Sequence, residues 1–321
     1  MPGTVFLDYA TDSRIPAMRV GGVSIVERVL RDAAARGVDH AIVRADSLPP
    51  LPGLSIAVVA IPAPAPAPTD AETIAADTIA GVRVTDEASR RRAHRALLQT
   101  CRRPYDGVGD RYVIRAFSLR LTGLLCRTRI TPNQVTSANI VVGFAACYAA
   151  LTACWWLAGL LAFVQVVLDS SDGELARVAY RSSRAGMILD NCSDDLIDNL
   201  FVACLGLGMG GVWAYVGVIA ACARSFCALM IHITVARAGK LGDVMAFQWW
   251  FDKPGEELAE RFEQKLTVGA VARAFGRRDL YVLVWAAACI AHVPVVGLVV
   301  SAFVSASQFG LAVAHLALRG R

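Results

Sequence analysis

The chain has 321 residues, of which 55% are hydrophobic and 18% charged, and its formal net charge is +5. Its mean hydropathy of +0.49 is too high for an ordinary soluble protein of this length. The arginines cluster beside apolar segments and do not alternate with aromatic residues, which argues against nucleic acid and favours lipid headgroups or phosphorylated substrates as partners. None of the nine cysteines has a CxxC spacing, so we expect neither a disulfide framework nor a zinc site.

The beginning of the chain predicts a small α/β domain, over residues 1–103. Its expected elements are strands at 4–10, 40–45 and 54–61, a helix at 24–38, a second helix at 71–80, a short strand near 82–84 and a basic helix near 86–103. The proline-alternating run from Pro62 to Pro68 is expected to be an extended spacer or surface loop. The N-terminus lacks the basic start and apolar core of a signal peptide.

An amphipathic helix is predicted over residues 110–129, where arginines alternate with apolar residues. Such a helix lies in the membrane interface and does not cross it. The run "TPNQVT" follows: Thr131 suits the N-cap of a long helix, Pro132 its first position and Gln134 a capping box.

Six apolar spans follow, judged against a hydrocarbon core of about 30 Å crossed at roughly 1.5 Å per residue. They lie near 134–153, 155–178, 184–208, 211–236, 279–293 and 295–318. Lys and Arg concentrate before the first span, in the 178–184 turn, in 237–278 and at the C-terminus. The positive-inside rule then places both termini and the acidic stretch on the cytoplasmic side of an inner or plasma membrane. In the turn before the fifth span, Asp279 is expected to cap that helix.

Residues 169–199 contain six aspartates between apolar runs, where an unpaired carboxylate is most costly. Asp169 and Asp172 are three residues apart, and Asp190 and Asp194 four apart, so each pair shares a helix face. The short turn between the two helices makes them antiparallel neighbours, so the four carboxylates should converge. Oxygen ligands favour Mg²⁺, Mn²⁺ or Ca²⁺ over zinc, and two divalent cations would relieve the repulsion.

The full pattern resembles the CDP-alcohol phosphotransferase family of integral membrane enzymes. It runs Asp169-x2-Asp172-Gly173-x2-Ala176-Arg177-x8-Gly186-x3-Asp190-x3-Asp194 and fits the family signature at all eight positions. The resemblance extends over about residues 104–321, so the expected fold is a helical membrane bundle with six transmembrane helices and a juxtamembrane amphipathic helix, preceded by a small α/β cytoplasmic domain. It also implies a homodimer.

The resemblance implies that the four signature aspartates bind two divalent cations, Mg²⁺ or Mn²⁺, and that Asp194 is the candidate base. The donor would be a CDP-alcohol and the acceptor an alcohol or phosphorylated alcohol, with CMP released. Nucleotide and phosphate binding is expected at Asn133, Gly173, Ala176, Arg177 and Gly186. The acceptor candidates are Asp198, Arg224 and Arg237, although Arg224 equally suits a structural pair with an acid. Asp195 and His232 are expected to make ordinary polar contacts.

A narrower similarity covers residues 101–136, "GRRDLY" and part of the head. It points to the branch in which an inositol-phosphate cytidylyltransferase is fused to a di-inositol-phosphate-phosphate synthase. The head lacks the glycine-rich loop that cradles a nucleoside triphosphate, so it is expected to be degenerate and to serve structural support or docking. Alternatives are a CDP-diacylglycerol-dependent phosphatidyltransferase with another acceptor and, less favoured, a non-catalytic or ion-translocating protein. An ion pathway needs acids spread through the membrane, whereas these gather at one level.

Overall fold

The chain folds into two compact units. The computed structural model describes residues 3–104, 106–252 and 277–319. The head unit comprises Met1–Cys101 and Thr122–Arg129, and the helical unit comprises Arg102–Leu121 and Ile130–Arg321. The short segment Thr122–Arg129 therefore packs with the head unit, although it belongs to the expected amphipathic helix. The boundary at residue 103 remains a prediction.

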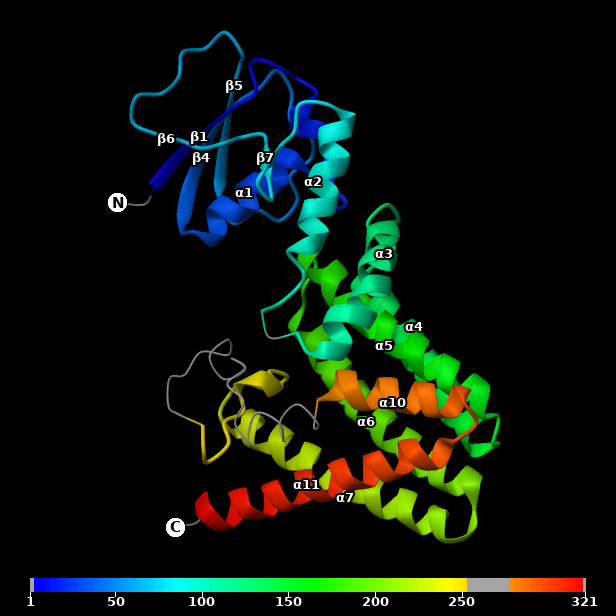
Figure 1. Ribbon diagram of the computed structural model, residues 1–321. Helices are drawn as coiled ribbons and strands as arrows, with labels where there is room; N and C mark the ends of the chain where they lie inside the picture. Colours follow the sequence, from blue (N-terminus) through cyan, green and yellow to red (C-terminus); the bar gives the residue numbers. More distant parts are fainter. Residues whose placement is uncertain (1–2, 105, 253–276, 320–321) are drawn as a thin grey trace. The chain divides into compact units, whose positions relative to one another are not determined.

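A four-stranded parallel sheet forms the centre of the head unit (Figure 1). Its strands are β1 (Gly3–Asp8), β4 (Val38–Arg44), β5 (Ala57–Ile61) and β6 (Glu72–Thr73), in the order β5-β4-β1-β6. Helix α1 (Ile25–Ala35) begins after Ser24, whose hydroxyl accepts a hydrogen bond from the Glu27 N–H, and it packs on β4. The predicted succession of strand, helix, strand and strand is confirmed.

The head unit differs from prediction at residues 71–80, which form strands and not a helix. β6 adds to the edge of β1, and β7 (Thr78–Ile79) pairs with β8 (Val82–Arg83) in an antiparallel hairpin. Ala80 and Gly81 have φ values of 48° and 76°, which suits the two-residue turn of a tight hairpin. Pairing of β6 with β1 and of β7 with β8 thus outweighs the local helical preference of the alanine-rich segment.

The remaining elements of the head unit either match the predictions or are too short to be predicted from the sequence. Residues Pro62–Pro68 have no regular secondary structure, as predicted. The basic helix is α2 (Glu87–Gln99), which begins at Asp86 with a capping box completed by Ser89. A single-turn helix, η1 (Ile15–Ala17), and the two-stranded ribbon of β2 (Arg19–Val20) and β3 (Val23–Ser24) were not predicted.

The second part of the chain is helical at every predicted span. Its elements are η2 (Asp110–Ile114), α3 (Arg115–Leu125), α4 (Pro132–Leu151), α5 (Trp155–Val178), α6 (Arg184–Met209), α7 (Gly211–Arg237), η3 (Val244–Ala246), α10 (Arg278–Ile290) and α11 (Pro294–Arg319). The capping box of α4 is confirmed: Thr131 Oγ1 accepts from the Gln134 N–H, and Gln134 Oε1 accepts from the Thr131 N–H.

Small residues let these helices approach closely. α4 contacts α5 and α6, α6 contacts α7, and α10 contacts both α5 and α11. Where α6 meets α7, a Cβ added to Gly206 would lie 2.8 Å from the Gly217 Cα, so larger residues would force the helices apart. The core of this unit combines alanines with Phe201 and Trp285, whose rings stack at 5.2 Å.

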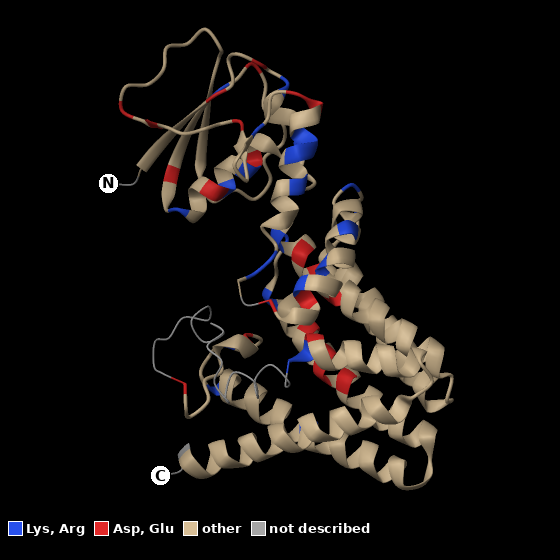
Figure 2. Cartoon of the chain, in the orientation of Figure 1, with Lys and Arg blue, Asp and Glu red and all other residues tan. Residues whose placement is uncertain are grey.

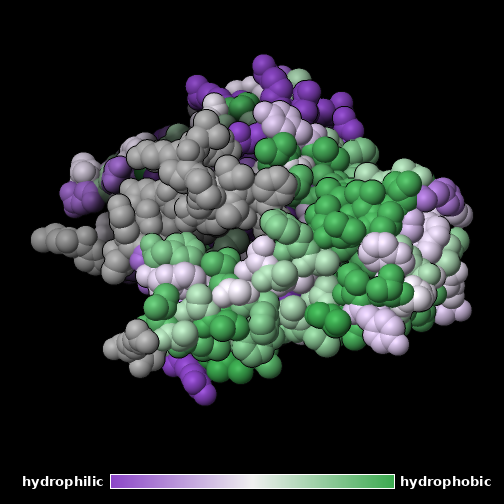
Figure 3. All heavy atoms as spheres, turned by 60° about the horizontal axis from the view of Figure 1, so that its bottom comes forward, coloured by the Kyte–Doolittle hydropathy of each residue, from purple (hydrophilic) through white to green (hydrophobic). Residues whose placement is uncertain are grey.

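Three of the described helices are long and apolar enough to cross a membrane: Pro132–Leu151, Gly211–Arg237 and Pro294–Leu318. Helices α5 and α6 carry the acidic stretch, and α10 has 13 residues. Large apolar side chains are nevertheless exposed on the bundle, including Val141, Tyr215 and Phe303, and Figure 3 shows apolar surface over much of its visible face. These features indicate an integral membrane protein, because water would disfavour so large an apolar surface.

The ion pair that joins β1 to β4 is expected to make the head unit acid-sensitive. Arg44 Nε donates to Asp8 Oδ1 at 2.9 Å, and this contact lowers the pKa of Asp8. A lowered pKa contributes stability above the unfolded value of about 3.9, and that stability is lost as the pH falls through the folded value. Hydrogen exchange of the full chain, corrected for intrinsic rates, should show β1 losing protection as the pH falls below about 4.

Asp8→Asn should reduce the protection of β1 already at neutral pH and flatten this pH dependence. Asp12→Asn is the control, because Asp12 pairs with Arg14 within one exposed turn. An unchanged pH profile in Asp8→Asn would contradict the assignment.

Candidate active site

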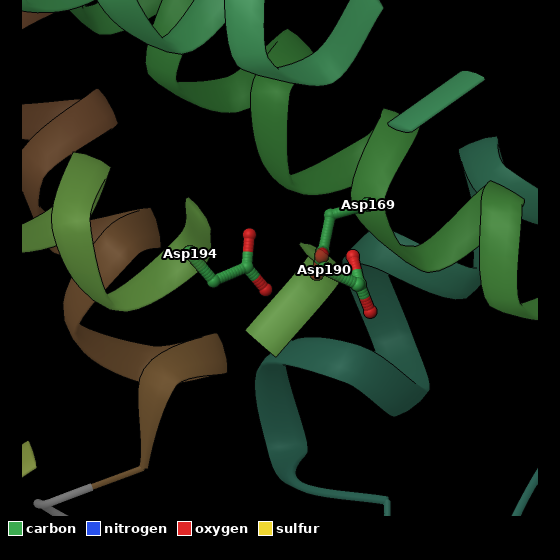
Figure 4. Close-up of side chains that lie close together, drawn as sticks. All are labelled: Asp169, Asp190 and Asp194. Carbon is green, nitrogen blue, oxygen red and sulfur yellow. The ribbon is translucent and has the colours of Figure 1, made fainter. Parts of the chain in front are cut away.

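Three carboxylates of α5 and α6 meet in the helical unit. Asp169 lies on α5, and Asp190 and Asp194 lie one turn apart on α6 (Figure 4). One carboxylate oxygen from each lies within 4.8 Å of the others, and all three side chains are partly buried. The acidic segments of α5 and α6 also face the basic start of α10 (Figure 2).

A short turn creates this convergence. α5 ends at Val178, and α6 begins after Ser183, whose hydroxyl accepts from the Gly186 N–H. Tyr180 adopts a φ of 52°, so the chain reverses within a few residues. The i,i+4 spacing on α6 then turns Asp190 and Asp194 toward α5.

Asp172, the fourth predicted metal ligand, lies outside this group of three oxygens. It is buried at 3% exposure, and its Oδ2 accepts a hydrogen bond from Thr136 Oγ1 of α4 at 2.6 Å. Thr136 therefore orients the carboxylate from a third helix. Thr136 was not predicted as a site residue, although it belongs to the "TPNQVT" run that begins α4.

The small residues of the predicted nucleotide site are close to its polar ones. A Cβ on Gly173 would lie 3.2 Å from Arg177 Nη1, and a Cβ on Gly186 would lie 2.8 Å from Asn133 Oδ1. The carbonyl of Ala176 accepts from the Arg181 N–H at the turn. The five residues thus line the same end of α4, α5 and α6, where Arg177 and Asn133 are exposed.

Two of the three acceptor candidates belong to a buried network. Arg224, 5% exposed, donates from Nε to Asn199 Oδ1 at 3.1 Å and from Nη2 to the Tyr281 hydroxyl at 2.6 Å. Tyr281 in turn donates to Asp198 Oδ2 at 2.9 Å. The Arg224 guanidinium also lies 4.3 Å from the centre of the Tyr281 ring. These contacts favour the structural alternative for Arg224, and acceptor binding by Arg224 and Asp198 stays a prediction.

Arg237 lies in a different setting. It is exposed at the end of α7 and lines a hollow of about 570 Å³ together with Thr234, Lys240 and Gln248. Asp195, expected to make a polar contact, lies 2.8 Å from His232 Nε2, which confirms that expectation for both residues.

Arg278 was not predicted as a site residue, and the predicted capping role of Asp279 is wrong. Arg278, the first residue of α10, donates to Asp169, Asp194 and Asp198. Asp279 does not cap α10, whose N-cap is Arg277 without a side-chain hydrogen bond. Its Oδ2 accepts from the Asp110 N–H at the start of η2, because tertiary packing brings that segment against α10.

Behind the site, a second buried ion network attaches the start of α3 to α5. Arg115 Nη1 donates to Glu174 Oε1 at 2.6 Å, and its Nε and Nη2 donate to Asp106. The Ser118 hydroxyl also donates to Glu174 at 2.7 Å. Glu174 therefore contacts α3 and takes no part in the cluster of Asp169, Asp190 and Asp194.

The donor set suits hard divalent cations. It contains only carboxylate oxygens, which favour ions such as Mg²⁺ or Mn²⁺. Within the described parts of the chain, Asp190 Oδ1 is buried and has no hydrogen-bond partner, which a cation would supply. The cluster of Asp169, Asp190 and Asp194 can thus hold a metal ion.

Residues 129–259 match the model of the CDP-alcohol phosphatidyltransferase family. This stretch, the family segment, is similar to that family over less than half of the chain. The family segment includes α4, α5 and α6 and therefore every carboxylate of the cluster.

Relatives agree with this assignment. The chain is 33% identical over 133 residues to the bifunctional IPC transferase and DIPP synthase of Thermococcus kodakarensis, an alignment that covers 40% of this chain and 30% of the relative. The protein of that name from Archaeoglobus fulgidus is 34% identical over 36% of this chain and 24% of its own length. The archaetidylinositol phosphate synthase of Pyrococcus horikoshii is 33% identical over 29% of this chain and 48% of its own length. The chain thus spans less than a third of the two bifunctional relatives.

Removing Arg115 should destabilise the helical unit. Arg115→Met leaves the buried Glu174 and Asp106 carboxylates without their cation, a change that typically costs about 3–5 kcal/mol or more. The double variant Arg115→Met/Glu174→Leu should recover part of this loss, because the Glu174 charge is then absent while Asp106 stays without its cation. Thermal unfolding of the detergent-solubilised protein measures both effects. A double variant less stable than the single one would contradict this account.

Proposed function

We propose that this chain is a CDP-alcohol phosphotransferase, which transfers a substituted phosphate from a CDP-alcohol to an acceptor hydroxyl and releases CMP. The observation that carries the proposal is the cluster of Asp169, Asp190 and Asp194, formed by residues of the family signature inside the family segment. Asp172, the fourth signature carboxylate, is oriented beside it by Thr136.

These four aspartates would hold two divalent cations, Mg²⁺ or Mn²⁺. When bound, such ions neutralise the donor pyrophosphate and the departing CMP, and they make the phosphorus more electrophilic. The protein's own part is to bring the carboxylates together.

Asp194 is proposed as the base that receives the proton of the acceptor hydroxyl. The acceptor oxygen forms a new bond to the phosphorus, and the bond between that phosphorus and the CMP oxygen breaks. Asn133 and Arg177 are exposed polar groups that suit the nucleotide and its phosphates. Gly173, Ala176 and Gly186 keep the approach free of larger side chains, and Asp198, Arg224 and Arg237 remain acceptor candidates.

The membrane arrangement that we propose has six transmembrane helices, α4 to α7, α10 and α11, with η2 and α3 as the interfacial helix. Both termini and the active site would lie in the cytoplasm, because the site adjoins the basic turn between α5 and α6. The short α10 and the acidic α5 and α6 would then contact the other helices more than lipid. A homodimer is part of the same proposal.

The relatives' names point to inositol-phosphate chemistry for the acceptor or donor, and we propose a polyol phosphodiester or phospholipid as product. A CDP-diacylglycerol donor with another acceptor is the alternative within the same reaction class. Ion translocation is less favoured, because the acids gather in one group. A donor and acceptor panel followed by mass spectrometry of the products would identify both substrates.

The test of the metal-dependent reaction is Asp190→Asn. This variant should release CMP at least about 100-fold more slowly in Mg²⁺ or Mn²⁺, because one cation ligand is lost. Asp195→Asn is the matched control, since Asp195 lies on the same helix and pairs with His232 outside the cluster. Full activity in Asp190→Asn, with any CDP-alcohol that the protein uses, would refute the proposal.

The head is proposed to have lost nucleotidyl transfer, since its first strand does not lead into a glycine-rich phosphate loop. The full chain should therefore release no pyrophosphate from CTP with phosphorylated polyols, measured by a coupled phosphate assay. CTP turnover that survives Asp190→Asn would assign this activity to the head and reverse the conclusion.

A further inference from the structure

One positively charged group already bridges the carboxylates proposed as cation ligands. Nη1 of Arg278 donates to Asp169 Oδ2 at 2.6 Å and to Asp194 Oδ2 at 2.7 Å. A single nitrogen from α10 thus joins a ligand of α5 to a ligand of α6. A bridging cation would occupy the corresponding position between these carboxylates.

The remaining nitrogens of Arg278 are also engaged. Nη2 donates to Asp194 Oδ1 at 3.1 Å, and Nε donates to Asp198 Oδ2 at 2.9 Å. The Arg278 side chain is 24% exposed, and the Tyr281 hydroxyl holds Asp198 from the other side. The guanidinium is therefore also held by Asp198, which lies outside the cation cluster.

Asp190 differs from its two partners in the cluster. None of the hydrogen bonds of Arg278 described above reaches it, and its Oδ1 is buried without a hydrogen-bond partner in the described chain. The cluster thus has two unequal parts. Asp190 receives no hydrogen bond from Arg278, whereas the Arg278 guanidinium neutralises Asp169 and Asp194.

A guanidinium and a divalent cation compete for the same oxygens. A Mg²⁺ ion requires ligands at about 2.0–2.1 Å in a fixed geometry, and two positive groups a few ångströms apart repel each other strongly in a bundle of low dielectric constant. We infer that Arg278 is a built-in competitor that makes the two cation positions unequal. The first cation enters at Asp190, and the second must displace Arg278 Nη1 from Asp169 and Asp194. This inference rests on the proposed two-cation function.

The same contact has a role before cations bind. Carboxylates as close as Asp169 and Asp194 repel one another, and Arg278 holds them together while no cation is present. Asp198 lies outside the cluster of three and can retain the guanidinium through Nε when Nη1 is displaced.

Calorimetric titration of the purified full chain in detergent with Mn²⁺ tests the inference. The wild type should bind a second Mn²⁺ more weakly than the first, and Arg278→Gln should bind the second about tenfold more tightly, equivalent to roughly 1.4 kcal/mol. Arg277→Gln is the matched control, because the neighbouring Arg277 pairs with Asp279. Without Mn²⁺, Arg278→Gln should also melt at a lower temperature than the wild type and gain more on Mn²⁺ addition.

A folded Arg278→Gln that binds Mn²⁺ no more tightly than the wild type would overturn the inference and leave the proposed function intact. Should that variant fail to fold, Arg278→Lys provides the test. Lysine keeps the charge but loses the planar fork, so the second Mn²⁺ should bind moderately more tightly, and weaker binding would overturn the inference. Absence of Mn²⁺ binding in the wild type would refute both the two-cation function and the competition.

Discussion

Repulsion between carboxylates inside an apolar helical bundle is the constraint on which the rest of the structure depends. Asp169, Asp190 and Asp194 lie close together among helices whose other faces are apolar, and Asp172 is buried nearby. Such charges are tolerated only when cations or hydrogen-bond donors offset them. The structure supplies Thr136 for Asp172 and Arg278 for Asp169 and Asp194, and within the described residues it leaves Asp190 Oδ1 without a partner.

The close packing of the bundle serves this arrangement. Glycines such as Gly206 and Gly217 allow the backbones to touch, and the short turn before Ser183 brings α5 and α6 together at their charged ends. The Arg115 and Glu174 pair then attaches the start of α3 behind the site. A chemistry that requires several fixed carboxylates is therefore supported by rigid helices, because their ligand oxygens must keep their positions before and after cations bind.

The two units follow different physical rules. The head unit is a water-soluble type of fold, in which a parallel sheet packs against α1, with polar side chains and an exposed ion pair at its surface. The helical unit exposes apolar side chains and buries its polar ones, including Asn139, Gln165 and Arg224. A polar interior is costly without partners, and here it includes the residues of the acidic cluster's surroundings, such as Asp172 and Asp198.

Local sequence determined most of the elements and three of the converging aspartates. The 3.6-residue period placed Asp190 and Asp194 on one face, and Thr131 with Gln134 marked the start of α4, because these effects depend only on residues within a turn or two. Only the tertiary structure decided which distant groups meet these residues. Arg278 lies 109 residues from Asp169, Thr136 binds Asp172 from another helix, and Glu72–Thr73 became a strand because β1 offered an open edge. Such contacts follow from how helices and strands pack, and spacing along the chain carries no signal for them.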